Sequence, residues 1–207
     1  TREAGALPEN EITAEKGIEV LRKIFDKEDL QSIRLAYENK SGSVETFCYE
    51  IKLERENGAA ASDNVKKSDK SEDYYTAYAD VTKRGGLLYS MIFYRDIEEP
   101  NLNADQAVEE GRKFLARAGF ENMEPSYYTV EGGCVTANYC VKQDDVMYYP
   151  DMVKVKIALD NGSPVGFEGH GYLACHSTEA GRVKPASISA ADARAVLSPN
   201  LTVESMR

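Results

Sequence analysis

The side chains best suited to chemistry lie close together near the end of the chain. Its only two histidines flank a cysteine, as His170, Cys175 and His176. Imidazole nitrogen and thiolate sulfur are donors that zinc favours in proteins, so these residues have the atoms of a zinc site. The sequence around them predicts a strand, however, and alternation along a strand would place Cys175 on the face opposite to both histidines. Because the spacing of neighbouring residues indicates no further ligand, we interpret the three as surface residues and expect no bound metal.

Carboxylates are the second group of candidates, at Asp144, Asp145 and Asp151. General acid/base catalysis needs a carboxyl with a raised pKa in a cleft, and nothing in the sequence indicates either, so we interpret these as turn residues. The sequence contains no nucleophile elbow, phosphate loop or His-Glu-x-x-His motif. Serine and cysteine have no evident histidine base to activate them. We therefore predict a protein without enzymatic activity and without a cofactor.

The thirteen tyrosines are a more suggestive feature. Most of them fall into two groups along the chain: Tyr74, Tyr75, Tyr78, Tyr89 and Tyr94, then Tyr127, Tyr128, Tyr139, Tyr148, Tyr149 and Tyr172. A tyrosine combines a large apolar ring with a polar tip, which suits half-buried sheet positions and protein interfaces alike. Both interpretations stay open. For the second, we select Tyr148, Tyr149, His170 and Tyr172 as candidate partner-binding residues.

A β-hairpin over residues 148–173 positions these four candidates. Apolar residues share one parity and mostly polar residues the other: Val153, Val155, Ile157 and Leu159 against Lys154, Lys156, Ala158 and Asp160. This alternation predicts a half-buried strand with its lysines in water. The turn formers Asn161-Gly162 follow, so we expect residues 165–167 to pair back onto residues 155–159.

Three predicted helices begin with the same pattern of residues. An apolar residue, a capping residue and alanine open each one, at residues 12–14, 102–104 and 188–190, or about 90 residues apart. Asn103 with Gln106 fits a capping box, and Pro199 stops the third helix. Alternating strand patterns follow the first two helices, with an exposed hairpin loop expected over residues 57–73.

The predicted fold class is therefore α+β, with tandem modules that each pack one helix on an antiparallel sheet of about four strands. We assign residues 1–98 to the first module and residues 99–181 to the second. Residues 182–207 are then the opening helix of an incomplete third module.

Composition excludes several classes of function. The chain has 207 residues, 42% of them hydrophobic and 29% charged, as in ordinary soluble globular proteins. The formal net charge of −10 argues against nucleic acid and anionic membranes as partners. No apolar run approaches the roughly 20 residues of a membrane-spanning helix. Cys48, Cys134, Cys140 and Cys175 form no Cys-x-x-Cys pair, which favours small buried residues, although a disulfide between separate strands stays open.

Residues 149–173, YPDMVKVKIALDNGSPVGFEGHGYL, resemble the YpeB family of spore-germination proteins, whose repeats are called PepSY domains. The ending from residue 188 to 207 resembles the opening of the next repeat, and residues 168–173 resemble the Gly-Tyr-Leu element of that family. The resemblance implies a non-enzymatic, extracytoplasmic protein at the inner membrane and cortex of the spore. It also implies a partner, the cortex-lytic peptidoglycan hydrolase SleB, in mutual stabilisation. The membrane anchor and the α-helical N-terminal region of such proteins are absent from this sequence.

Two functional hypotheses follow from the resemblance. In the first, the modules bind, stabilise or regulate a SleB-like peptidoglycan hydrolase. In the second, they inhibit a protease, because PepSY units also occur in peptidase propeptides. Co-purification distinguishes the two, since the first predicts a cortex-lytic hydrolase as partner and the second a metalloprotease.

Thermal denaturation tests the interpretation of the two histidines. We expect the melting temperature to stay the same on addition of zinc or of a chelator, because a real site would add its binding free energy to folding. A zinc-dependent shift of several degrees that disappears in His170→Ala would contradict it.

Overall fold

The structure, a computed structural model, describes residues 7–25, 30–54, 74–143, 146–176 and 187–202. The loop expected over residues 57–73 and the aspartates at 144 and 145 lie outside these ranges. The chain divides into two compact units, Thr1–His176 and Ser177–Arg207, which are described separately.

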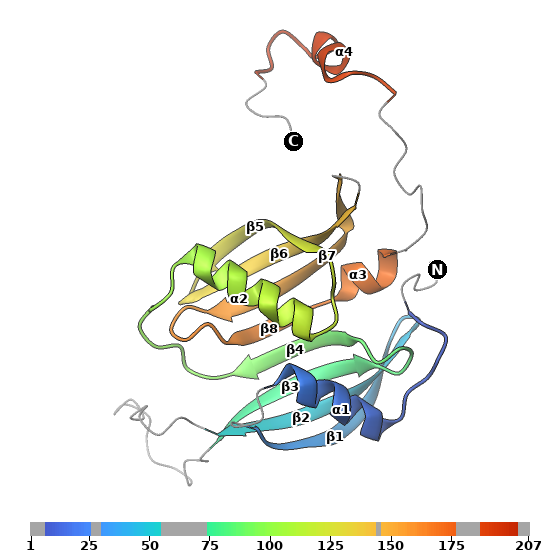
Figure 1. Cartoon of the computed structure of the whole chain (residues 1–207), viewed down its shortest axis with the longest axis vertical. Helices are drawn as coiled ribbons and strands as arrows, with labels where there is room; N and C mark the ends of the chain where they lie inside the picture. The colour runs from blue at the N-terminus through green and yellow to red at the C-terminus, as the bar shows by residue number, and fades with distance from the viewer. Residues whose placement is uncertain (1–6, 26–29, 55–73, 144–145, 177–186, 203–207) are drawn as a thin grey trace. The chain divides into compact units, whose positions relative to one another are not determined.

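The first unit is built on one antiparallel sheet. Within the described residues, eight strands take the order β1-β2-β3-β4-β8-β7-β6-β5 (Figure 1). The elements along the chain are α1 (Ala14–Ile24), β1 (Leu30–Ser41), β2 (Val44–Glu54), β3 (Tyr74–Thr82), β4 (Leu88–Tyr94), α2 (Ala104–Arg117), β5 (Met123–Glu131), β6 (Cys134–Gln143), β7 (Val146–Ala158), β8 (Pro164–Glu168) and α3 (His170–Cys175). We call α1 with β1–β4 the N-terminal half, and α2 with β5–β8 and α3 the C-terminal half.

The two halves join through their last strands. Strand β4 pairs antiparallel with β8, with Met91 opposite Phe167 at the centre of the pairing. One hydrophobic core runs through both halves, from Leu21 of α1 to Phe114 of α2. The predicted mixed class with an antiparallel sheet is confirmed. The division into tandem modules stays a prediction, because the strands form one continuous sheet.

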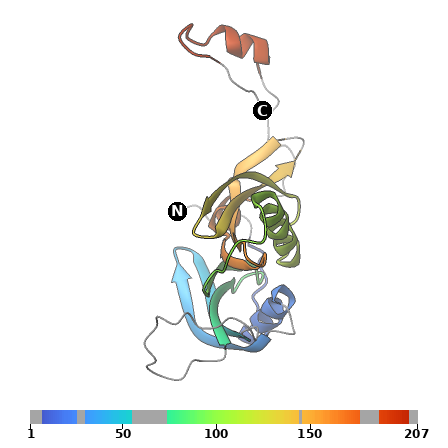
Figure 2. The ribbon, with the colours of Figure 1, turned by 90° about the vertical axis from the view of Figure 1, so that its left-hand side faces the viewer.

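Both long helices lie on the same face of the sheet and leave the opposite face open (Figures 1 and 2). Alternate residues of β7, such as Val153 and Val155, are fully buried beneath α2, whereas Lys154 and Lys156 are exposed on the open face. The predicted pairing of residues 165–167 back onto residues 155–159 is confirmed, since Val155 pairs with Phe167, whereas the end of the predicted hairpin range, from His170, is helical. Strand β1 has no counterpart among the predicted strands, because it lies at the edge of the sheet and is mostly exposed.

The helix starts follow the predicted caps. Thr13 accepts a hydrogen bond from the backbone N–H of Lys16, and Asn103 and Gln106 form the capping box. Gly119, directly after the C-cap of α2, has φ +85°, the left-handed conformation in which glycine commonly ends a helix.

The second unit contains a short helix, α4 (Ala190–Ala195), which begins with a capping box between Ser189 and Asp192. It ends at Ala195, four residues before Pro199, the residue expected to stop it. None of its described residues is buried, and Val196 just after it is 81% exposed. Among the helices of the described residues, none has the length and apolar character needed to cross a membrane.

A glycine–tyrosine contact sets how closely each long helix approaches the sheet. The Tyr49 hydroxyl donates to the carbonyl oxygen of Ala14 at 2.8 Å, directly beneath Gly17. The Tyr139 hydroxyl donates to the carbonyl oxygen of Val108 at 2.6 Å, directly beneath Gly111. In both cases a Cβ atom on the glycine would overlap with the tyrosine hydroxyl. Burial raises the pKa of both phenols, to about 12 for Tyr49, so both remain protonated donors.

A buried ion pair ties the connection after β4 to the turn between β7 and β8. The Arg95 guanidinium donates to both oxygens of Asp160 at 2.6 Å, and both side chains are only 6% exposed. Asp160 also accepts the backbone N–H of Glu98 at 2.9 Å. The hydrogen bonds from Arg95 lower the pKa of Asp160 below its usual value, so the ionised carboxylate is the form that stabilises the fold.

Gly111→Ala tests the contact between α2 and the sheet. The added methyl group overlaps with the Tyr139 hydroxyl, so we expect the free energy of unfolding to fall by about 2 kcal/mol, as in overpacked cores. Tyr139→Phe in the same chain removes the hydroxyl and should restore part of this loss, measured by urea denaturation. Gly119→Ala is the control for strain without overlap, because no atom lies within 4 Å of a Cβ there. If Gly111→Ala lowers the free energy of unfolding equally in the native background and in the Tyr139→Phe background, the proposed overlap with the hydroxyl is contradicted.

Asp160→Asn tests the buried ion pair. Its folded pKa lies below the unfolded value near 4, so its stabilisation is fully present above about pH 4 and is lost as pH falls through the folded pKa. Removing one member of a buried pair costs about 3 kcal/mol. We expect the variant to lose about that much at neutral pH and to show a weaker decline of stability on acidification. Glu99→Gln, at an exposed carboxylate of the same connection, is the matched control. An unchanged acid profile in Asp160→Asn would show that the carboxylate is not the group that titrates.

Candidate functional site

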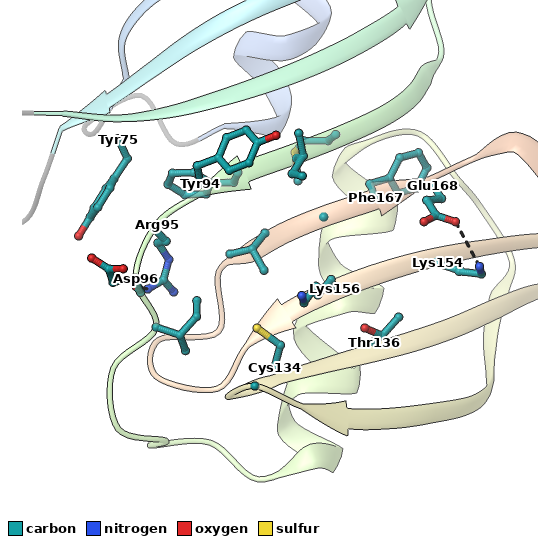
Figure 3. Close-up of a pocket in the computed structure, with 17 residues that line it drawn as sticks. Tyr75, Tyr94, Arg95, Asp96, Cys134, Thr136, Lys154, Lys156, Phe167 and Glu168 are labelled. Atoms are coloured by element: carbon teal, nitrogen blue, oxygen red, sulfur yellow. Dashed lines mark hydrogen bonds and ion pairs between the residues drawn. The ribbon is translucent and has the colours of Figure 1, made fainter. Parts of the chain in front are cut away.

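The open face of the sheet is hollowed above strands β4, β8, β7 and β6 (Figure 3). This hollow has a volume of about 740 Å³, and we call it the open-face groove. The side chains that define its chemistry are Ile92, Tyr94, Thr136, Lys154, Lys156 and Glu168. Arg95 and Asp96 close one end, where the chain leaves β4 (Figure 3).

The strand register brings these side chains together in rows. Ile92 of β4 lies opposite Gly166 of β8, which lies opposite Lys156 of β7, which lies opposite Thr136 of β6. Side chains opposite one another on neighbouring strands share a face, so this row crosses the groove. Gly166 has no side chain, and an added Cβ would lie 3.2 Å from the Cβ of Lys156. The floor of the groove is therefore backbone at its centre.

A second row carries the charges next to the first. Glu168 lies opposite both Ser90 and Lys154, and the Lys154 ammonium lies 3.2 Å from the Glu168 carboxylate (Figure 3). Both side chains are about half exposed, so the pair is weakened by water and salt. Lys156 is exposed, and within the described part of the chain no ion pair is found for it. The groove thus has one partly neutralised lysine and one free lysine.

The Cys134 thiol lies at the edge of the groove but is not a reactive group. It is 3% exposed, and burial raises its pKa, an effect that the nearby Lys156 ammonium only partly opposes. A thiol must ionise to act as a nucleophile, so this cysteine is a small buried residue. Cys48 and Cys140 are also buried thiols, as the sequence favours.

The open face of the N-terminal half differs because its charges are already bound. Arg34 donates to both oxygens of Glu50, at 3.0 and 2.9 Å. Ser90 donates to Asp80 at 2.6 Å. A hydrogen bond with Cys48 raises the pKa of Tyr37 to about 12, so this tyrosine stays neutral. The named polar groups of this half of the face thus bind one another, except for the second oxygen of Asp80, which is buried without a hydrogen-bond partner.

The four partner-binding residues selected from the sequence do not form one surface patch. Tyr148 is only 9% exposed, whereas its neighbour Tyr149 is 55% exposed, as successive residues of β7 point to opposite faces. His170 is exposed at the start of α3, with its ring 4.3 Å from that of Tyr89. Tyr172 is partly buried, with its ring 5.0 Å from Phe120. Their role in partner binding stays a prediction.

The strand expected around the histidines is wrong. His170–Cys175 is the helix α3, which packs against β7, and His176 caps its C-terminal end. The local reason is Gly171: an added Cβ would approach the carbonyl oxygen of Met152 to 2.6 Å, so only glycine allows α3 to lie this close to β7. Across the described residues, no group of three or more His, Cys, Asp and Glu side chains could hold a metal ion.

The interpretation of Asp151 as a turn residue is also wrong. It lies within β7, is fully buried, and accepts a contact of 2.9 Å from Nδ1 of His176. The His176 ring in turn stacks on Tyr172 at 4.2 Å. This cluster fixes the end of the first unit. The sequence does not indicate that Asp151 is buried, because an aspartate between proline and methionine gives no sign of a buried partner.

The open-face groove was not predicted either. The alternation of residues 153–159 places Lys154 and Lys156 in water, which is correct, but it gives no sign of what lies beside them. The groove depends on the pairing of β4 with β8, two strands far apart in the sequence. The signal that could have indicated it is Gly166 at the centre of a strand, where a missing side chain often marks close approach of another group.

Comparison with known proteins gives consistent results. A family described as "YpeB sporulation, PepSY1 and PepSY2 domains" matches residues 1–181. The sporulation protein YpeB of Halalkalibacterium halodurans is 30% identical over 126 residues, which cover 61% of this chain and 28% of that protein. The sporulation protein YpeB of Bacillus subtilis is 27% identical over 165 residues, covering 77% of this chain and 36% of that protein. The chain thus spans about a third of the length of these relatives.

A solved structure shares the fold. The Bacillus megaterium YpeB C-terminal domain superposes with a TM-score of 0.70 at 22% identity, covering 96% of this chain and 80% of that one. At this level of identity the likeness supports the fold alone. The family match over most of the sequence identifies the chain: it belongs to the YpeB family of sporulation proteins and carries the region described as PepSY1 and PepSY2.

Proposed function

We propose that this chain is a non-catalytic module of a germination protein that binds, stabilises or regulates a spore cortex-lytic peptidoglycan hydrolase of the SleB type. The observation that carries the proposal is the open face of the sheet, which is hollowed over four strands and lined by exposed lysine and aromatic side chains. The part of this face around Ile92, Tyr94, Lys154 and Lys156 is exposed, and an exposed surface with large apolar side chains is suited to a partner. The family supports the setting, because its named relatives are sporulation proteins.

A binding role fits the polar groups of the molecule better than catalysis. The buried Asp151 contacts His176 at 2.9 Å on the helix side of the sheet. Among the described residues, no serine, threonine or cysteine is found hydrogen-bonded to the His176 ring, as a nucleophile activated by it would be. The one thiol in the groove is buried and neutral. These features support a protein that works by surface contact.

The tandem modules are part of the same proposal. In each half, the residue before the helix cap donates its N–H at 2.8 Å to the turn after the third strand: Ile12 to Lys83 and Leu102 to Leu159. The repeated order of one helix and four strands, with the glycine–tyrosine contact in both, supports modules at residues 1–98 and 99–181. Ser189 caps α4 as Thr13 and Asn103 cap α1 and α2, which supports a third module from residue 182 onward.

The proposed location follows from the family and is extracytoplasmic in the spore, at the inner membrane and cortex. In a longer protein, a membrane anchor would precede this region. Residues 149, 170 and 172 are exposed or partly exposed, and we keep them as further candidate partner contacts, although none of them lines the groove.

Co-purification tests the proposed function. The tagged chain is mixed with a purified SleB-type hydrolase, and separately with a metalloprotease of the same organism, and each mixture is resolved by size-exclusion chromatography. We expect a complex with the hydrolase, and slower proteolysis of the hydrolase when the chain is present. A complex with the metalloprotease alone would instead support the inhibitor hypothesis. Absence of a hydrolase complex at micromolar concentrations would contradict the proposal.

A further inference from the structure

We propose that the open-face groove binds an extended acidic segment of a partner protein, in which carboxylate and apolar side chains alternate. Lys154 and Lys156 of β7 would receive the carboxylates, and Ile92 and Tyr94 of β4 the apolar side chains. The inference locates a contact for the partner-binding role proposed above and rests on that role.

The first argument is the spacing of the lysines. Lys154 and Lys156 are two residues apart on one strand and on one face, so their Cα atoms are about 7 Å apart. An extended segment has the same repeat between side chains on one side. Carboxylates at alternate positions therefore match both ammonium groups without distortion of either backbone.

The second argument is the shape of the groove. Strand β8 lies between β4 and β7 and has no side chain at its central residue, Gly166, so the groove is shallowly floored there, with the stem of Lys156 alongside. The flanking wall on β4 is apolar and exposed, with Ile92 46% and Tyr94 58% accessible to solvent. A segment above β8 would turn one set of side chains toward β7 and the other toward β4. Alternation of acidic and apolar residues is the chemistry that satisfies both walls.

The third argument comes from the other half of the sheet. Asp80 pairs with Ser90 between β3 and β4 as Lys156 pairs with Gly166 between β7 and β8. In the N-terminal half, Ser90 donates to Asp80 at 2.6 Å, so these side chains cover the strand where Gly166 leaves the backbone uncovered in the other half. The same backbone arrangement thus holds quite different side chains on its open face. The two lysines and the glycine are not requirements of the fold.

The fourth argument is charge. The chain has a formal net charge of −10, so an acidic segment must be attracted by the local charges of Lys154 and Lys156 and not by the protein as a whole. Glu168 competes for Lys154 across 3.2 Å, but the half-exposed pair is weak enough for an incoming carboxylate to replace it. The net charge of the chain opposes such binding, and the two local lysines hold it. Because salt screens the attraction to these lysines, we expect the affinity to fall strongly as salt is raised.

Fluorescence anisotropy on the full chain tests the proposal with defined probes. A fluorescein-labelled peptide of four Glu-Val repeats is compared with one of four Lys-Val repeats. We expect the acidic peptide to bind at low salt, its affinity to fall at least fivefold when salt is raised tenfold, and the basic peptide not to bind. Equal binding of both peptides, or binding of neither, would overturn the proposal. So would binding of an anionic polysaccharide such as polygalacturonate at these lysines without binding of the acidic peptide.

Variants locate the site. Lys154→Gln with Lys156→Gln should lower affinity for the acidic peptide at least tenfold. The matched control is Lys16→Gln with Lys113→Gln, which removes the same charge from α1 and α2 and should change affinity less than twofold. Glu168→Gln frees Lys154 and should raise affinity two- to fivefold, a gain that misfolding cannot produce. Equal affinities in the two lysine pairs, or a loss in Glu168→Gln, would contradict the site.

The same variants separate this inference from the proposed function. If the hydrolase forms a complex equally well with the native chain and with Lys154→Gln/Lys156→Gln, the groove is not its contact and the inference fails while the function stands. If the acidic peptide binds at the lysines but the hydrolase forms no complex, the proposed function fails instead.

Discussion

The fold depends on how closely two helices can approach one sheet, and a single repeated contact sets that distance. In each half a tyrosine crosses the core and donates to a helix carbonyl, three residues before a glycine that leaves room for the ring. A buried hydroxyl without this acceptor would cost several kcal/mol, and any larger residue at the glycine would overlap with it. The helix, the tyrosine and the sheet are therefore fixed together, and the apolar residues between them fill the space that remains. All of this packing lies on one face, which is why the other is left open.

The open-face groove exists because the halves join through their last strands. Pairing of β4 with β8 places Ile92 and Tyr94 next to Gly166, with the lysines of β7 just beyond. The buried pair of Arg95 and Asp160 holds the connection after β4 against the turn before β8, so it keeps the two strands in register at one end. Neither half has this surface alone. The candidate site is a property of the junction, although every residue in it occupies an ordinary strand position.

This origin explains which parts could be predicted from the sequence. The caps at Thr13 and Asn103 and the turn at Asn161-Gly162 depend on neighbouring residues, and all three are as expected. Helix α3 was mistaken for a strand because its six residues are too few to show a helical period, and its position depends on contact with β7. Asp151 was misread because its partner, His176, reaches it only after β8 and α3 have folded back. The groove needs a pairing between distant strands, and local periodicity does not contain that information.

The halves share their backbone contacts and differ in the side chains of the open face, and this contrast separates structure from function. The kinds of contact that pack the helices recur in both halves: a hydrogen bond from the residue before the cap, and a glycine above a tyrosine hydroxyl, four residues after the cap in α1 and eight residues after it in α2. The open-face side chains do not recur, since Asp80 and Ser90 stand where Lys156 and Gly166 stand in the other half. Burial constrains the first set in any protein with this fold. The second set faces water in both halves, so stability places little demand on it, and a lysine pair above a bare glycine needs another explanation. Contact with an acidic partner supplies one, and it predicts that the N-terminal half, where Arg34 is already bound by Glu50 and Asp80 is acidic, does not take part in that contact.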